Sequence, residues 1–154
     1  MESINALEHD IPFNILLADD DEDDRYFFES ALIKLRLNQH YTSVDDGEEL
    51  MEYLLHLEGL LPDVLFLDYN MPRKNGEECL IEIKKHPTLK DLPVIIYSTC
   101  ISNEIAQKLY DLGAYFYVRK TDEKSLEKML KEVYTLLMIK RTARPKKENF
   151  LIAY

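Results

Sequence analysis

The chain of 154 residues is long enough to bury one hydrophobic core and too short for two domains of ordinary size. Hydrophobic residues make up 46% of it and charged residues 31%, a composition that is typical of a folded soluble protein and excludes a disordered chain. The net charge of -10 would repel a phosphate backbone, so we expect no binding of nucleic acid.

Neither the cysteines nor the apolar segments direct the chain out of the cytoplasm. Cys79 and Cys100 lie far apart and lack the paired spacing of a zinc site or a disulfide framework. The apolar runs stay well short of the roughly 20 residues that a membrane helix needs. We therefore expect a cytoplasmic protein without membrane contact.

Short apolar runs that suit buried strands alternate with segments of helical periodicity. The first strand is expected over Phe13 to Ala18, and the acidic residues Asp19 to Asp24 lead from it into a helix that ends near Leu35. The alternation predicts further strands near residues 41–44, 64–67, 94–97 and 115–118, and further helices near 48–57, 77–85, 103–112 and 126–137. Five strands and five helices therefore alternate.

The order of elements predicts the fold class. Parallel strands need crossover connections, and right-handed crossovers on both faces of a sheet give a doubly wound fold. We predict an α/β protein, a three-layer α/β/α sandwich around a flavodoxin-like parallel five-stranded sheet of order 2-1-3-4-5. Residues 1–12 would form an N-terminal extension, residues 13–140 the domain and residues 141–154 a C-terminal tail.

Polar residues end the apolar strands on the side where such sheets bind ligands. Asp19 and Asp20 follow the first strand, Asp68 the third, Ser98 the fourth and Lys120 the fifth. Three carboxylates in one crevice repel one another unless a hard cation lies among them. Mg²⁺ suits such a site because it binds carboxylate and phosphate oxygens together. The Lys120 ammonium and the Ser98 hydroxyl would then contact the remaining phosphoryl oxygens.

These segments resemble the receiver domains of bacterial response regulators in two-component systems, whose sheet order the chain is expected to share. The similar segments are Ile15 to Asp21 for the acidic-pair strand, Leu65 to Pro72 with Asn75 and Gly76 for the phosphoacceptor strand and loop, Pro93 to Ser98 for the switch-hydroxyl strand, and Tyr117 to Lys120 for the strand with an aromatic residue and a lysine. The resemblance covers about residues 13–140.

The resemblance implies that Asp68 is the nucleophile that accepts a phosphoryl group from a phosphohistidine. The donor would be a sensor histidine kinase or a histidine phosphotransfer protein. Mg²⁺ would be the cofactor, and its ligands would be Asp19, Asp20, Asp68 and the backbone carbonyl of Asn70.

By the same resemblance, Ser98 and Tyr117 are switch residues that move when Asp68 is phosphorylated, while Lys120 binds the phosphoryl group. The moving face would bind a downstream protein that the sequence does not identify, and a homodimer is also open to it. The chain would thus be a stand-alone signalling switch rather than an enzyme, because it catalyses only its own phosphorylation and dephosphorylation.

The sequence departs from the family at two positions. Thr121 follows Lys120 where family members usually carry Pro, which puts the conformation of that loop in question. Thr99 follows Ser98 where a small residue is common, and it could narrow the access of water to a phosphoryl group.

The sequence also bears on three alternative interpretations. A calcium loop beginning at Asp19 fails on spacing, because its sixth place lacks Gly and Ser30 occupies its twelfth. A phosphatase with an aspartyl nucleophile usually carries a second Asp where Asn70 stands. A phosphorylation-independent pseudo-receiver is left open as an interaction module.

The C-terminal tail has a basic beginning and an apolar end, Phe150 to Tyr154. Its hypothesised role is to dock this apolar end on the domain or on a second copy, whereas the simpler expectation is a solvated, frayed terminus.

Overall fold

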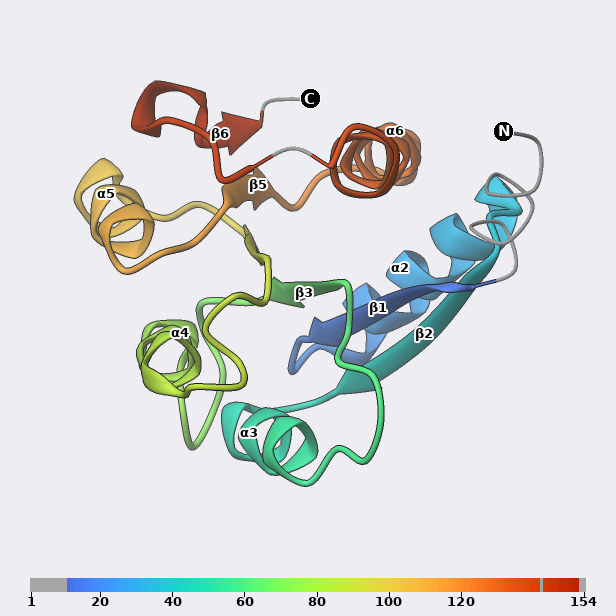
Figure 1. Cartoon of the computed structure of the whole chain (residues 1–154). Helices are drawn as coiled ribbons and strands as arrows, with labels where there is room; N and C mark the ends of the chain where they lie inside the picture. Colours follow the sequence, from blue (N-terminus) through green and yellow to red (C-terminus); the bar gives the residue numbers. More distant parts are fainter. Residues whose placement is uncertain (1–10, 142, 153–154) are drawn as a thin grey trace.

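The apolar runs of the sequence become the strands of one parallel sheet (Figure 1). The computed structural model describes residues 11–141 and 143–152. The strands are β1 (Phe13–Ala18), β2 (Gln39–Val44), β3 (Val64–Leu67), β4 (Val94–Ser98), β5 (Phe116–Arg119) and β6 (Leu151–Ile152). They pair in the order β2-β1-β3-β4-β5-β6, which confirms the predicted order of the first five and adds a short sixth strand beyond β5.

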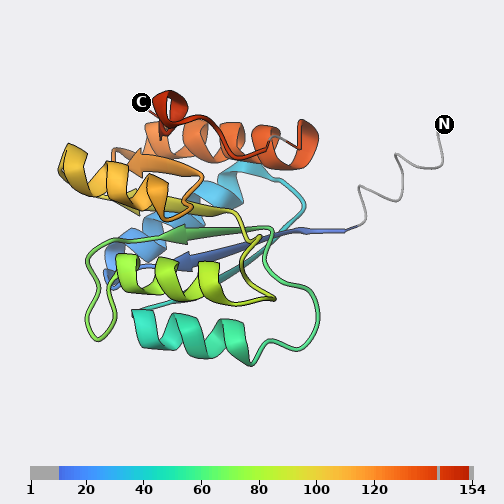
Figure 2. The same ribbon diagram turned by 60° about the vertical axis from the view of Figure 1, so that its left-hand side comes forward.

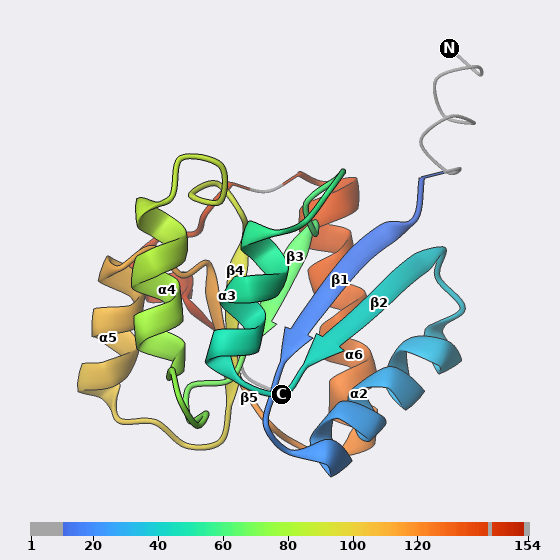
Figure 3. The same cartoon turned by 90° about the horizontal axis from the view of Figure 1, so that it is seen from below.

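Helices cover both faces of the sheet, so the predicted three-layer sandwich is confirmed (Figure 2, Figure 3). The α-helices of the described residues are α2 (Glu22–Leu35), α3 (Gly47–Leu55), α4 (Gly76–Lys85), α5 (Asn103–Asp111) and α6 (Glu123–Tyr134). Helices α2 and α6 pack together on one face, and α3, α4 and α5 cover the other. A π-helical turn, Thr135–Ile139, continues α6. Among the described residues, none of the helices has the length and apolar character that crossing a membrane requires.

Each of these α-helices begins at a side chain that caps its first turn. The capping residues are Asp21, Asp46, Asn75, Ser102 and Asp122. Each side chain accepts a hydrogen bond from a backbone N–H two or three residues later, which stabilises a helix by about 1 kcal/mol. Since each capped turn follows a strand in the chain, the caps fix the loops at the carboxyl edge of the sheet.

Two apolar layers hold the sheet between the helices. In β1, Ile15 and Leu17 face the layer of α2 and α6, whereas Leu16 faces the opposite layer. Phe28 of α2 is fully buried, and its ring meets the ring of Phe66 with the centroids 5.0 Å apart. Burial on both faces explains why the central strands β3 and β4 are continuous apolar runs rather than alternating ones.

Several element boundaries differ from the expected ones, and three of the differences have a direct structural reason. Strand β2 begins at Gln39, because it pairs with β1 from Phe13 onward. Strand β4 includes Ser98, which pairs with Arg119 instead of following the strand. Helix α2 begins inside the acidic run, so that Asp24 lies in its first turn.

The C-terminal segment, residues 143–151, lies on the domain along α5 and β5, as the docking hypothesis for the tail expected. Phe150 is only 5% exposed, and its carbonyl accepts a hydrogen bond of 2.9 Å from the Tyr117 backbone N–H. Leu151 then pairs with Tyr117 in the sheet (Figure 1). Most of the expected N-terminal extension, residues 1–10, and the last two residues of the tail lie outside the described residues.

Candidate functional site

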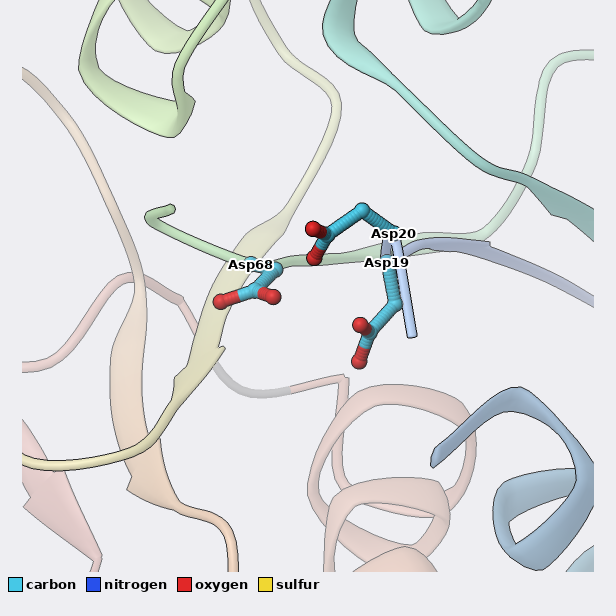
Figure 4. Close-up of side chains that lie close together, drawn as sticks. All are labelled: Asp19, Asp20 and Asp68. Atoms are coloured by element: carbon cyan, nitrogen blue, oxygen red, sulfur yellow. The ribbon is translucent and has the colours of Figure 1, made fainter. Parts of the chain in front are cut away.

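Three carboxyl groups converge at the carboxyl edge of the sheet (Figure 4). Asp19, Asp20 and Asp68 each offer an oxygen, and these oxygens lie within 4.8 Å of one another. The pairing of β1 with β3 produces this arrangement, because Ala18 lies opposite Leu67 and the next residue of each strand is an aspartate. Asp19 is fully buried, Asp68 is 5% exposed and Asp20 faces solvent. The predicted convergence of these three residues is therefore present in the structure.

Both carboxylate oxygens of Asp68 are held by side chains from the next two strands. The buried Ser98 hydroxyl donates a hydrogen bond of 2.9 Å to Oδ1, and Lys120 Nζ donates one of 3.1 Å to Oδ2. The Lys120 backbone N–H donates to the carbonyl of Ser98, which fixes the two residues relative to each other. Asp68 thus has a hydroxyl donor on one oxygen and a cation on the other.

The Lys120 ammonium contacts three carboxylates at once. Its Nζ lies 2.7 Å from Asp19 Oδ2, 2.8 Å from Asp24 Oδ2 and 3.1 Å from Asp68 Oδ2. Burial by itself lowers the pKa of Lys120, but the adjacent carboxylates of Asp19, Asp24 and Asp68 outweigh it and the pKa is raised. The lysine therefore stays protonated and gives the site a permanent positive charge.

The raised pKa values of Asp19 and Asp20 show that one lysine does not balance the negative charge of the site. Burial raises the pKa of Asp19 to about 6; the Asp68 charge adds to this, and Lys120 opposes it. The pKa of the exposed Asp20 is also raised, by partial burial and then by Asp68. The crevice thus favours protonation of both groups when no further cation is present.

The residues present fit a hard divalent cation. Asp19 Oδ2 is buried and forms no hydrogen bond of good geometry, although Lys120 Nζ lies close to it. The converging donors are all carboxylate oxygens, which Mg²⁺, Mn²⁺ and Ca²⁺ prefer, and they include none of the Cys or His ligands that most protein zinc sites use. Asn70 is exposed in the loop two residues after Asp68, and the role of its backbone carbonyl as a ligand stays a prediction.

Gly76 allows the loop after Asp68 to fold back closely on that residue. A Cβ atom at Gly76 would lie 2.5 Å from the backbone oxygen of Asp68, and the Gly76 N–H donates to the carbonyl of Tyr69. A side chain is therefore excluded here by the close approach of the loop after Asp68 to the first turn of α4.

Tyr117 is buried, with its hydroxyl pointing to the segment that follows Ser98. Tyr117 Oη donates a hydrogen bond of 2.9 Å to the carbonyl of Thr99 and accepts one of 3.4 Å from the N–H of Ile101. The described peptide bonds are all trans, and Lys120 reaches the site with Thr121 behind it. The departure from Pro at Thr121 does not remove the lysine from the site.

Sequence reasoning missed one member of this cluster, Asp24. The acidic run was interpreted as the beginning of a helix, which is correct, but the contact of Asp24 with Lys120 was not expected. The available signal was only its place in the first turn of the helix that follows Asp19 and Asp20, which begins at the same edge of the sheet. A second acidic group of the described residues, Asp45, Asp46 and Glu49, lies apart from Asp68 at the beginning of α3.

Comparisons with known proteins agree with this architecture. The family model of the response regulator receiver domain matches residues 15–131. Response regulator Rcp1 of Synechocystis sp. is 29% identical over 131 residues, which cover 82% of this chain and 89% of Rcp1.

Two solved structures share the fold over most of their length. The crystal structure of the phosphorylated cyanobacterial phytochrome response regulator RcpA gives a TM-score of 0.76 at 30% identity, covering 88% of this chain and all of RcpA. The Mn²⁺-bound form of Rcp1 gives a TM-score of 0.74 at 27% identity, again covering 88% of this chain and all of that one. The chain belongs to the family of response regulator receiver domains of two-component systems, whose members act in phosphorelay signalling.

Proposed function

We propose that the chain accepts a phosphoryl group on Asp68 from a histidine kinase or a histidine phosphotransfer protein, with Mg²⁺ as cofactor, in the cytoplasm. One observation carries the proposal above the others. The Asp68 carboxylate lies between the Ser98 hydroxyl and the Lys120 ammonium, beside the carboxylates of Asp19 and Asp20. This is a nucleophile with a cation, a hydroxyl donor and a set of metal ligands around it.

The chemistry follows from these groups. A carboxylate oxygen of Asp68 attacks the phosphorus of a phosphohistidine, the new P–O bond forms, and the P–N bond breaks with its electron pair going to the ring nitrogen. Lys120 and Ser98, which already contact the two oxygens of Asp68, stabilise charge on the phosphoryl oxygens. Bound Mg²⁺, held by Asp19, Asp20, Asp68 and the Asn70 carbonyl, would neutralise further charge there.

The output is a change in protein contacts rather than turnover of a substrate. A phosphoryl group offers Ser98 stronger acceptors than a carboxylate does, so the hydroxyl follows it. Thr99 and Tyr117 are tied to that movement, because the Tyr117 hydroxyl bonds the carbonyl of Thr99. The chain is therefore a phosphoacceptor and not an enzyme with a separate substrate. The face of α5, β5 and α6 is the surface that changes.

Related proteins support two parts of the proposal, phosphorylation and the binding of a divalent cation. RcpA was crystallised phosphorylated, and Rcp1 was crystallised with Mn²⁺ bound, so related receivers take both the modification and a divalent cation. The net charge of -10 argues against DNA as the target and favours a protein partner.

The test is modification by acetyl phosphate in the presence of Mg²⁺, followed by intact-mass spectrometry and Phos-tag electrophoresis. We expect one phosphoryl group on the wild type and none on Asp68→Asn or after addition of EDTA. Asp45→Asn is the matched control, because it removes an exposed carboxylate outside the site and should be modified normally. A wild type that resists both acetyl phosphate and phosphorylated histidine donors would contradict the proposal and favour the pseudo-receiver.

A further inference from the structure

The C-terminal segment is attached to α5 and its following turn by an arginine. The guanidinium of Arg144 lies 3.9 Å from the centre of the Tyr110 ring, and its Nε donates a hydrogen bond of 3.0 Å to the carbonyl of Ala114. Tyr110 Oη donates in turn to the carbonyl of Pro145, at 2.9 Å. These contacts place the segment along α5.

Farther along the segment, Phe150 is inserted between two tyrosines. Its ring packs edge-on against Tyr110 at 5.4 Å between centroids and lies 6.4 Å from the ring of Tyr117. Its carbonyl also accepts the backbone N–H of Tyr117. The next residue, Leu151, is 49% exposed, so the buried apolar contact of the segment depends on Phe150.

Tyr117 therefore connects the C-terminal segment with the phosphoacceptor. At one end of this path the Ser98 hydroxyl bonds Asp68, and Thr99 next to it accepts the hydroxyl of Tyr117. At the other end Tyr117 contacts Phe150 through both its backbone N–H and its ring. A movement of Ser98 toward a phosphoryl group acts on Thr99, then on the Tyr117 ring and then on Phe150.

We propose that the C-terminal segment is an intramolecular ligand of the α5–β5 surface and that its docking is coupled, through Tyr117 and Phe150, to phosphorylation of Asp68. This rests on the proposed function. The ring of Phe150 packs against the Tyr117 ring, and the Tyr117 hydroxyl bonds the carbonyl of Thr99 next to Ser98, so the segment and the phosphoacceptor act on the same side chain. The proposed sign is positive, so docking and phosphorylation favour each other, and the coupling of the two equilibria is then equal in both directions.

The occupant of this surface is the chain's own segment rather than a second copy. The helical stretch after α6 ends at Ile139, only five residues before Arg144, so the connection holds the segment at high effective concentration beside its own domain. Its Arg144 and Lys147 are basic, Lys147 lies 3.4 Å from the Asp111 carboxylate, and the chain as a whole carries a net charge of -10. A downstream partner that needs this surface must displace the segment or bind it in place.

The first experiment compares the ratio of phosphorylated to unphosphorylated chain reached with acetyl phosphate in Phe150→Ala and in the matched control Leu151→Ala. Loss of the buried ring is expected to lower this ratio about fivefold, the lower end of usual coupling strengths, whereas loss of the exposed Leu151 side chain changes nothing. Arg144→Gln loosens the segment at a point that does not contact Tyr117 and is expected to act in the same direction. Arg144→Gln therefore still tests the coupling if Phe150→Ala fails to fold.

The second experiment measures hydrogen exchange of the Tyr117 amide, whose N–H bonds the carbonyl of Phe150. Phosphorylation should slow this exchange in the wild type and leave it unchanged in Asp68→Asn. Phosphorylated wild type with unaltered exchange, and variants phosphorylated to the same extent as the wild type, would overturn the coupling alone. Protection that rises with protein concentration would assign the surface to a second copy and overturn the intramolecular docking. A wild type that never takes a phosphoryl group would refute the proposed function and the coupling with it.

Discussion

Replacing Asp19 by Asn is expected to stabilise the metal-free protein at neutral pH, although Asp19 lies at the centre of the site. Asp19 is fully buried, and its charge faces that of Asp68, while Lys120 and a hydrogen bond from the Asp21 backbone N–H oppose the repulsion. Asn has nearly the same shape and no charge. The substitution therefore removes a buried negative charge and leaves the packing around it in place.

The size of the effect follows from the pKa of Asp19, which burial raises from 3.8 to about 6. A shift of about two units corresponds to about 3 kcal/mol of preference for the neutral form. Between these two values the folded chain holds a proton that the unfolded chain has lost, so the free energy of unfolding falls as the pH rises. The destabilisation by the buried charge is fully present above the pKa of Asp19 in the folded chain, about 6, and disappears as the pH falls toward its pKa in the unfolded chain, 3.8. The gain from Asp19→Asn is at most about 3 kcal/mol at neutral pH and vanishes in acid.

The assay is thermal unfolding in EDTA at about pH 7.5 and at about pH 4.5. For a chain of this size the full gain corresponds to a rise of roughly 6–12 °C in the midpoint. Asp45→Asn, which removes an exposed carboxylate, should show no such gain. An Asp19→Asn variant that is no more stable than the wild type at neutral pH, or equally stabilised at both pH values, would refute the reasoning.

Three further predictions concern the metal and the neighbours of Asp68. Mg²⁺ at about 10 mM should raise the unfolding midpoint of the wild type by mass action and leave Asp68→Asn unchanged in scanning fluorimetry. Gly76→Ala should cost about 1–3 kcal/mol and slow phosphorylation, since its Cβ would lie 2.5 Å from the Asp68 carbonyl. Gly59→Ala also strains the backbone, because Gly59 has a φ of +110°, but its Cβ meets open space, so the phosphorylation rate should stay unchanged. Asp24→Asn and Lys120→Met should show a coupling of about 1 kcal/mol in a double-mutant cycle of unfolding free energies, and additive effects would contradict the direct contact.

The fold could be predicted from the sequence because its strands are buried on both faces. A run such as Val64 to Leu67, fully buried in the structure, leaves few alternatives to a central parallel strand. The short strand β6 had no such signal, because two residues show no periodicity and their pairing depends on where Phe150 binds. The ends of elements were also less well specified, as Ser98 shows, since the last residue of a strand is set by its partner on β5.

The candidate site was predictable to the extent that it is built from strand ends. Asp19, Asp68, Ser98 and Lys120 each follow or end an apolar run, and parallel strands bring such positions to one edge. Asp24 joins the cluster from a helical turn, where its direction depends on the angle at which α2 leaves the sheet. That angle is a property of packing and not of local sequence.

Packing of the core also fixes the distances around Asp68, through side chains that take no part in the reaction. Ser98 Oγ and Lys120 Nζ meet the two oxygens of Asp68 only because β3, β4 and β5 pair in one register, with Leu67 opposite Ile96 and Ile96 opposite Tyr117. A slip of one residue would turn every side chain of a strand to the other face. The buried residues forbid that slip, since it would exchange their positions between two differently shaped apolar layers. The core therefore stabilises the sheet and, by the same contacts, holds a hydroxyl, a cation and three carboxylates together at a cost in stability that the core must offset.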